Sequence, residues 1–165
     1  MPFDPEIHHR KSIRLEGYDY SQPGAYFVTI VTFERIELFG VVQGNEMNLS
    51  PYGQTVQRIW NYLPRHFSYV ELGAFCLMPN HLHAVVVMID SKAAMRPLPE
   101  IVRWFKTTSA RRINEQRQTP RIPVWQRNYY EHIIRSAKEL DQIDLYIKSN
   151  PDMWAQDSEN PDQRL

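Results

Sequence analysis

The run Leu77-Met78-Pro79-Asn80-His81-Leu82-His83-Ala84-Val85-Val86-Val87 is the strongest structural signal in this chain. The β-branched residues after the histidines predict a buried strand, and Pro79-Asn80 predicts the turn that leads into it. Side chains two residues apart on a strand project from the same face, so this strand would aim both imidazoles at one point. His81 and His83 are therefore candidate metal ligands. The alternative is a pair of half-buried histidines that make only hydrogen bonds.

The composition is that of one ordinary globular domain. The chain has 165 residues, of which 42% are hydrophobic and 23% are charged. Its only cysteine, Cys76, excludes an intrachain disulfide and a cysteine-rich zinc site, so a metal would need His, carboxylate or amide ligands. No apolar run approaches the roughly 20 residues of a membrane span, and the first residues lack a signal-peptide pattern. We therefore expect a cytoplasmic protein with no membrane partner.

A net charge of zero hides two oppositely charged segments. Residues 101–140 contain nine Lys and Arg against three acidic residues, whereas residues 141–165 contain six acidic residues against two basic ones. A basic segment of this kind either binds an anionic partner or is simply a solvated helix face.

Outward from the histidine run, the sequence predicts a small mixed fold. Residues 69–77 and 81–89 form a hairpin that we expect at the centre of a sheet, with a strand at 25–33, a shorter one at 38–43 and an edge strand at 128–134. Helices are predicted from Pro51 to Pro64, from about 99 to 118, and from Ser136, in a capping box with Glu139, to Pro151.

This order of elements predicts an α+β fold. It is the order of a ferredoxin-like split βαβ sandwich, an antiparallel sheet with helices on one side, to which a C-terminal helix carrying a tyrosine is added. We divide the chain into an N-terminal basic arm at 1–23, a catalytic domain at 24–154 and a flexible acidic tail at 155–165.

The C-terminal helix carries the second half of a candidate site. Tyr146 and Asn150 are four residues apart and so share one helix face. If this helix packs near His81, the Asn150 amide oxygen could complete a site for Mg²⁺ or Mn²⁺, and the Tyr146 phenol could attack a phosphodiester held there. The alternatives are an amphipathic-helix tyrosine and a helix C-cap residue before proline.

Several motifs in order resemble one known family. They are Arg14-Leu15 with Tyr18-Asp19-Tyr20, the run 24–29 (Gly-Ala-Tyr-Phe-Val-Thr), the run 78–83 (Met-Pro-Asn-His-Leu-His), the run 125–135 (Trp-Gln-Arg-Asn-Tyr-Tyr-Glu-His-Ile-Ile-Arg) and the run 146–151 (Tyr-Ile-Lys-Ser-Asn-Pro). With these motifs the chain resembles the HUH single-tyrosine transposases of the insertion-sequence type, and most closely the REP-associated tyrosine transposases.

The resemblance implies a role for each candidate residue. It implies Tyr146 as the nucleophile, His81 and His83 as the histidine pair, and Asn150 as the third ligand of Mg²⁺ or Mn²⁺. The implied reaction nicks and rejoins single-stranded or hairpin DNA through a 5′-phosphotyrosine, in a monomer or a homodimer. Two other functions stay open: a non-catalytic nucleic-acid-binding ferredoxin-like protein, and a metal-dependent hydrolase that uses an activated water.

Further residues are candidates for DNA contacts or for rival roles. The candidates for DNA contacts are Arg103, Lys106, Arg117 and Arg127 in the basic segment and Arg10, Lys11 and Arg14 in the arm. Tyr129 and Tyr130 are the rival nucleophiles, although an edge-strand tyrosine commonly serves packing or base stacking instead.

Overall fold

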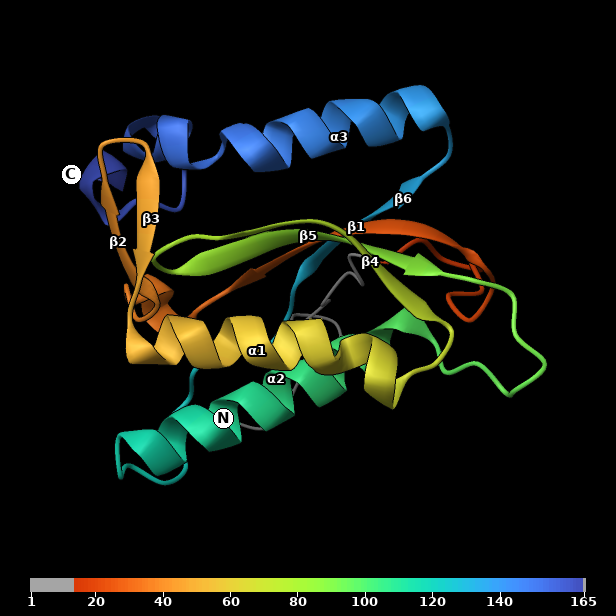
Figure 1. The fold of residues 1–165 in the computed structure, drawn as a ribbon, viewed down its shortest axis with the longest axis horizontal. Coiled ribbons are helices and arrows are strands. Elements are labelled where there is room, and N and C mark those ends of the chain that lie inside the picture. Colours follow the sequence, from red (N-terminus) through yellow and green to blue (C-terminus); the bar gives the residue numbers. More distant parts are fainter. Residues whose placement is uncertain (1–13, 165) are drawn as a thin grey trace, which may run out of the picture.

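The fold centres on a four-stranded antiparallel sheet in a computed structural model that describes residues 14–164. The strands lie in the order β4 (Val70–Leu77), β5 (His81–Met88), β1 (Gly24–Val31) and β6 (Tyr130–Ile134). Figure 1 shows the sheet between two layers of helix. The split βαβ order and the antiparallel pairing confirm the predicted ferredoxin-like fold.

Each face of the sheet has its own helices and its own apolar cluster. Helices α1 (Pro51–His66) and α2 (Leu98–Gln116) cover one face, and α3 (Ala137–Ser149) crosses the other, as Figure 1 shows. The alternation of strand side chains explains this division, because Val28 joins the large α1–α2 core whereas its neighbour Phe27 joins the smaller α3 cluster. His81 and His83 alternate with Leu82 of the large core, so their strand presents them to α3.

One strand position and one helix end differ from the sequence predictions. The hairpin of β4 and β5 was predicted at the centre of the sheet, but only β5 is central, because it lies between β4 and β1 and leaves β4 at an edge. Helix α1 continues past Pro64 to His66. Pro64 has no N–H to donate to the Trp60 carbonyl, so the helix loses one ladder hydrogen bond within its last turn. The helix ends where Phe67 adopts an extended conformation.

A small hairpin lies beside the main sheet. Its strands β2 (Gly40–Gln43) and β3 (Glu46–Leu49) pair with each other in a separate two-stranded sheet. The sequence predicted only a strand at 38–43, because the short second strand alternates exposed and half-buried residues and has little apolar signal. A 3₁₀ turn, η1 (Phe33–Arg35), connects β1 to this region.

The segment expected to be a flexible tail makes specific contacts within the described residues. It follows α3 as two short 3₁₀ helices, η2 (Pro151–Gln156) and η3 (Pro161–Arg164). The Glu159 carboxylate forms an ion pair with Arg35 at 2.6 Å, and the Asn160 side chain donates to the Trp154 carbonyl at 2.9 Å. The acidic composition of this segment suggested a flexible tail, because composition alone does not show contacts between distant residues. The division into arm, domain and tail stays a prediction.

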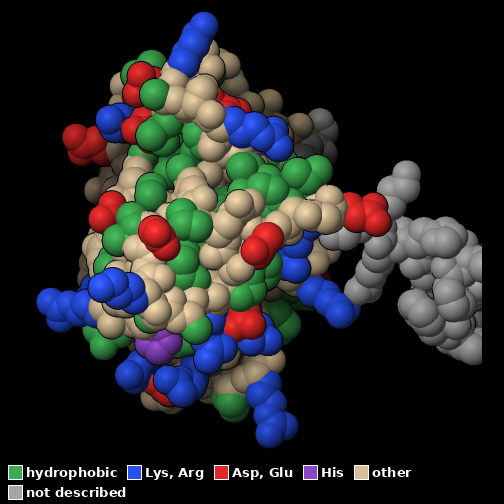
Figure 2. Space-filling model, turned by 90° about the vertical axis from the view of Figure 1, so that its right-hand side faces the viewer, with side chains coloured by type: hydrophobic (Ala, Val, Ile, Leu, Met, Phe, Trp, Pro, Cys, Tyr) green, Lys and Arg blue, Asp and Glu red, His purple; other side chains and the backbone are tan. Residues whose placement is uncertain are grey.

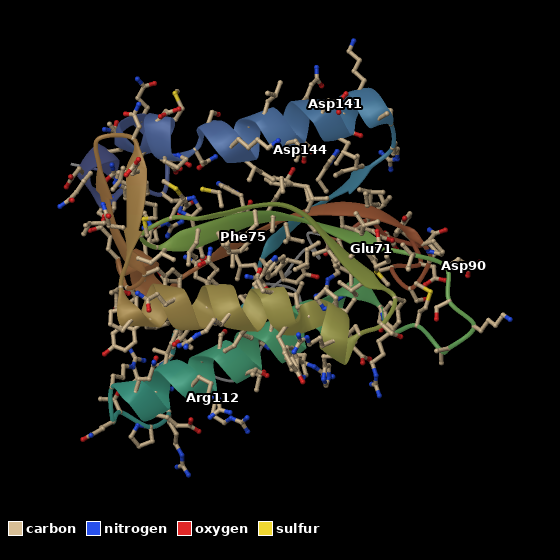
Figure 3. All side chains as sticks on the ribbon, viewed as in Figure 1. Glu71, Phe75, Asp90, Arg112, Asp141 and Asp144 are labelled. Atoms are coloured by element: carbon tan, nitrogen blue, oxygen red, sulfur yellow. The ribbon has the colours of Figure 1, made fainter. Side chains whose placement is uncertain are left out.

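Helices α2 and α3 carry opposite charges to the two sides of the sheet. In Figure 3, Asp141 and Asp144 lie on α3 on one side of the sheet, whereas Arg112 lies on α2 on the other.

Arg10 and Lys11 of the predicted arm fall outside the described residues. Among residues 14–164, no helix combines the length and the apolar character that crossing a membrane requires.

Candidate active site

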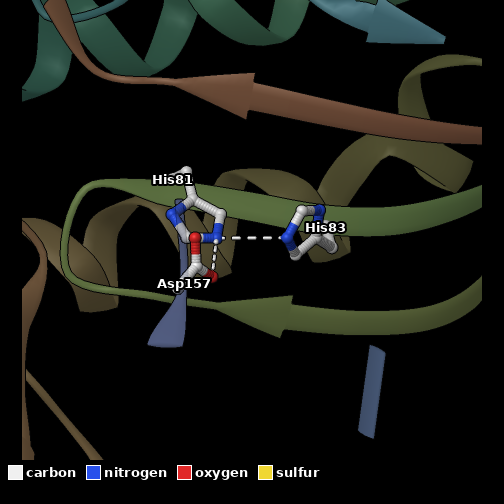
Figure 4. Close-up of side chains that lie close together, drawn as sticks. All are labelled: His81, His83 and Asp157. Carbon is white, nitrogen blue, oxygen red and sulfur yellow. Dashed lines mark hydrogen bonds and ion pairs between the residues drawn. The ribbon is translucent and has the colours of Figure 1, made fainter. Parts of the chain in front are cut away.

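The two histidines form the centre of a buried polar site on the α3 face. The exposed fraction is 0% for His81 and 5% for His83. Their Nε2 atoms lie 3.1 Å apart, and the Asp157 carboxylate lies 3.5 Å from the His81 Nε2 atom, as Figure 4 shows. The strand therefore aims both imidazoles at one point, as the two-residue spacing predicts.

Neighbouring side chains hold the far side of each imidazole. The His81 Nδ1 atom lies 2.9 Å from the Asn80 Oδ1 atom, and the His83 Nδ1 atom lies 2.7 Å from the Thr29 hydroxyl. The Asn80 oxygen can only accept, so the His81 Nδ1 atom donates to it and the His81 Nε2 lone pair is left for a ligand. The Thr29 hydroxyl, by contrast, can donate to or accept from His83. Burial lowers the pKa of His81 from 6.5 to about 4, and burial together with the nearby His81 lowers the pKa of His83 to about 3. Both rings are thus neutral near pH 7, which is the form that binds metal.

Helix α3 brings Tyr146 and Asn150 to the same site. Ile147, buried against Phe27 and Val85, anchors the helix to the sheet. The Tyr146 phenol oxygen then lies 3.4 Å from the His83 Nε2 atom, and the tyrosine ring stays half exposed. Asn150 is 2% exposed, and its side-chain oxygen is buried and makes no hydrogen bond of ordinary geometry among the described residues. The Asn150 side chain nevertheless lies close enough to His81 to raise the pKa of that histidine, against the larger lowering by burial. The structure therefore brings together the four residues that the sequence selected.

The donor atoms of this site fit one divalent cation. Two ligands at about 2.1 Å from a cation and at roughly a right angle to each other lie about 3 Å apart, close to the separation of the histidine Nε2 atoms. Donor atoms of His81, His83 and Asp157 all lie within 4.8 Å of one another. The unpartnered Asn150 oxygen is a further candidate ligand, because a buried carbonyl oxygen needs a partner. Imidazole nitrogens suit transition-metal ions, and the carboxylate and amide oxygens suit Mn²⁺ and Mg²⁺.

Sequence reasoning missed Asp157 as a candidate ligand. In the sequence it is one of six acidic residues between positions 141 and 165, and its spacing from the histidines carries no signal. One local hint exists in hindsight. Trp154, an aromatic residue in that polar segment, lies with its ring centroid 6.1 Å from the His81 ring and anchors the segment over the site.

Phe27 packs at the base of the site. Its ring stacks on His83 with centroids 5.6 Å apart and meets the rings of Tyr146 and Tyr130 edge to face, each at 6.1 Å. Tyr130 on β6 pairs with Thr29 on β1, which in turn pairs with His83, so Tyr130 shares the face of the histidines. Within the described residues it makes no hydrogen bond to either histidine. Tyr129 is buried on the opposite face. Of the rival tyrosines, only Tyr130 lies on the side of the candidate metal site.

The predicted DNA-contacting residues gather on the other side of the sheet. A cavity of about 360 Å³ is lined in part by Arg14, Arg103, Lys106, Arg127 and Tyr129. Figure 2 views the right-hand end of the molecule in Figure 1 and shows several Lys and Arg side chains on its lower part, at the level of α1 and α2. The structure thus joins four of the predicted basic residues around one cavity.

Two of the basic candidates, Lys106 and Arg117, also make structural contacts. The Lys106 ammonium donates to the carbonyls of Gln126 and Arg127 at 2.6 and 2.9 Å, and its burial lowers its pKa to about 8. Arg117 lies outside the lining of that cavity and donates to Asn114 and to the Ile122 carbonyl. Lys106 therefore holds the loop before β6 as well as lining the cavity.

The chain has clear relatives. A family model described as IS200-like transposase matches residues 53–150. An uncharacterised protein of Haemophilus influenzae is 38% identical over 176 residues, covering 94% of this chain and 95% of the relative. A second Haemophilus influenzae protein, assigned to the REP-associated tyrosine transposases, is 31% identical and covers 81% of this chain and 73% of the relative.

Solved structures support the same fold. A REP-associated tyrosine transposase bound to a REP hairpin superposes with a TM-score of 0.60 at 20% identity, covering 84% of this chain and 73% of that one. A Deinococcus radiodurans protein assigned as a transposase superposes with a TM-score of 0.52 at 18% identity, covering 82% of this chain and 96% of that one.

Proposed function

The chain belongs to the IS200-like transposase family, and we propose that it cleaves and rejoins single-stranded hairpin DNA through a 5′-phosphotyrosine on Tyr146. The observation that carries this proposal is the position of the Tyr146 phenol, 3.4 Å from the His83 Nε2 atom at the edge of a buried polar site. A phosphate bound at the two imidazoles would lie within reach of this phenol, which is half exposed and so accessible to DNA.

The histidines and Asn150 would hold the divalent cation, Mg²⁺ or Mn²⁺, with Asp157 as a further ligand. When bound, the cation would act as a Lewis acid that polarises the phosphodiester. The phenol oxygen of Tyr146 would form the new bond to phosphorus and give up its proton. The bond from phosphorus to the 3′ oxygen would break, and that oxygen would take up a proton to become the free 3′-hydroxyl. Reversal of the same step rejoins the strand, because the phosphotyrosine conserves the bond energy.

We further propose that one chain contains a complete active site. Tyr146 reaches His83 of its own chain, so catalysis in cis requires no partner subunit. The relative solved with a REP hairpin supports hairpin DNA as the substrate class. The cavity lined by Arg14, Arg103, Lys106 and Arg127 would contact the phosphate backbone on the opposite face of the sheet.

The decisive experiment looks for the covalent intermediate. Labelled single-stranded hairpin DNA is incubated with the protein and Mn²⁺ or Mg²⁺ and is then resolved on a denaturing gel. We expect a protein–DNA adduct in the wild type and in Tyr130→Phe, and its loss in Tyr146→Phe and in the metal-free sample. Tyr130 is a matched control because it is a half-exposed tyrosine on the same face of the sheet.

Other outcomes would point to other functions. DNA cleavage without an adduct would indicate a hydrolase that uses water. DNA binding without cleavage, under conditions in which the metal binds, would indicate a non-catalytic nucleic-acid-binding protein. An adduct that persists in Tyr146→Phe and disappears in Tyr130→Phe would show that the wrong tyrosine has been assigned.

A further inference from the structure

A closed ring of contacts runs through the Asn80 side chain. The Asn80 Oδ1 atom lies 2.9 Å from the His81 Nδ1 atom, and the Asn80 amide nitrogen donates to the Glu159 carbonyl at 2.7 Å. The Glu159 backbone N–H donates to the Asp157 carboxylate at 2.8 Å, and the other oxygen of that carboxylate lies 3.5 Å from the His81 Nε2 atom. We propose that Asn80 is a positioning residue that presents two candidate ligands, His81 and Asp157, to the metal.

The orientation of the Asn80 amide follows from its partners. Its nitrogen donates to two carbonyls, those of Arg35 at 3.1 Å and Glu159 at 2.7 Å, and a carbonyl can only accept. The atom facing His81 is therefore the oxygen, which also can only accept. The His81 Nδ1 atom must carry the proton, and this tautomer leaves the Nε2 lone pair directed at the site.

The same amide acts on Asp157 from the other direction. Asp157 lies on the segment after η2, outside the sheet, and its carboxylate meets the sheet at the Nε2 atom of His81 on β5. Its carboxylate is placed through Glu159, whose carbonyl is bound by Asn80 and whose side chain pairs with Arg35. The oxygen of the Asn80 side chain thus orients His81 on β5, and its nitrogen holds the segment that carries Asp157.

The placement of Asn80 suits this role. Its side chain is fully buried, and its backbone carbonyl accepts from Thr32 at 2.8 Å in the turn before β5. Its position therefore depends on the sheet itself and not on the metal. The role of Asn80 in metal binding rests on the proposed metal site. Its effect on the tautomer of His81 can be measured without any metal.

The first test measures the His81 tautomer directly. Long-range ¹H–¹⁵N NMR of the metal-free protein separates the two neutral tautomers of each histidine. We expect the wild type to hold His81 with its proton on Nδ1, and Asn80→Ala to shift His81 toward a mixture. The signals of His132, whose imidazole contacts Glu139 and not Asn80, serve as an internal reference that the fold is intact. An unchanged His81 tautomer in Asn80→Ala would overturn the inference.

The second test measures Mn²⁺ affinity from the EPR signal of the free ion. We expect Asn80→Ala to weaken Mn²⁺ binding by about 10- to 100-fold, as loss of partners behind metal ligands commonly does. Asp157→Ala should weaken binding in the wild-type background and have little further effect in Asn80→Ala, because Asp157 is already misplaced there. The matched control is Asn48→Ala, an exposed asparagine of β3 that should leave affinity unchanged.

The outcomes separate this inference from the proposed function. A wild type that does not bind Mn²⁺ refutes the proposed metal site, whereas the NMR result still decides the role of Asn80. Wild-type binding with fully additive effects of Asn80→Ala and Asp157→Ala refutes the link to Asp157. If Asn80→Ala fails to fold, Asn80→Asp replaces it, because a carboxylate can still accept from His81 and cannot donate to Glu159. In that variant we expect the His81 tautomer to persist and Asp157→Ala to have no further effect.

Discussion

Acid should destabilise the metal-free protein well before its carboxylates are protonated. The pKa values of His81 and His83 in the folded state are lowered from 6.5 to about 4 and about 3, chiefly by burial. As the pH falls below 6.5, the unfolded chain binds protons that the folded chain refuses. The stability that depends on the neutral pair is therefore complete above pH 6.5 and is lost as the pH falls toward 4.

The size of the effect follows from the window between these values. At pH 5 both imidazoles of the folded protein are still neutral, whereas the pH is about 1.5 units below their unfolded pKa of 6.5. This difference lowers the free energy of unfolding by about 2 kcal/mol per imidazole. A loss of this order is a large share of the stability of an ordinary domain. Bound Mn²⁺ should oppose it, because the metal binds only the neutral rings.

Urea unfolding at pH 7.5 and pH 5 in the presence of EDTA measures this difference. A His81→Gln/His83→Gln variant should show a much flatter pH dependence. The exposed His66 provides the matched control, since His66→Gln should keep the wild-type dependence. An unfolding free energy that is the same at both pH values in the wild type would show that the histidine pair is not held neutral by burial, and would refute the reasoning.

Three further substitutions test the fold and the basic cavity. Ser136→Ala removes the side chain that caps α3 and should lower stability by about 1 kcal/mol in thermal unfolding. Gly53→Ala should destabilise by about 1–3 kcal/mol despite its helical position, because the new Cβ would lie 2.1 Å from the Phe39 carbonyl oxygen; an unchanged melting temperature would contradict this. Arg103→Ala should weaken hairpin DNA binding and reduce the salt slope by about 1, whereas the exposed Arg112, outside the cavity, should tolerate alanine in the same titration.

The local features of the site could be predicted from the sequence. Strand alternation places His81 and His83 on one face, and helical spacing places Tyr146 and Asn150 on one face, because both periodicities are properties of the backbone. The predicted capping box is half present: Ser136 caps the backbone of Glu139, whereas the Glu139 carboxylate accepts from Arg135. The resemblance to a known family supplied the link between the two halves, and the position of the Tyr146 phenol beside His83 agrees with it.

Contacts between distant segments could not be predicted in the same way. Asp157 lies beside His81 in a segment held by contacts from distant parts of the chain, among them Asn80 and Arg35 to Glu159 and the Trp154 ring near His81. The edge position of β4 likewise depends on which strand fills the space beside β1. Sequence periodicity does not predict such arrangements, because the position of each segment depends on competition among long-range contacts.

The sequence by itself therefore determined the fold class, the histidine strand and the helix that carries Tyr146, since these follow from local backbone geometry and side-chain patterning. Only the tertiary structure decided that these elements meet at one buried site, that a tail carboxylate joins them, and that the basic cavity lies on the opposite face of the sheet. The physical reason is that burial and the pairing of polar groups are properties of the packed chain. Neither exists until residues far apart in sequence have come together.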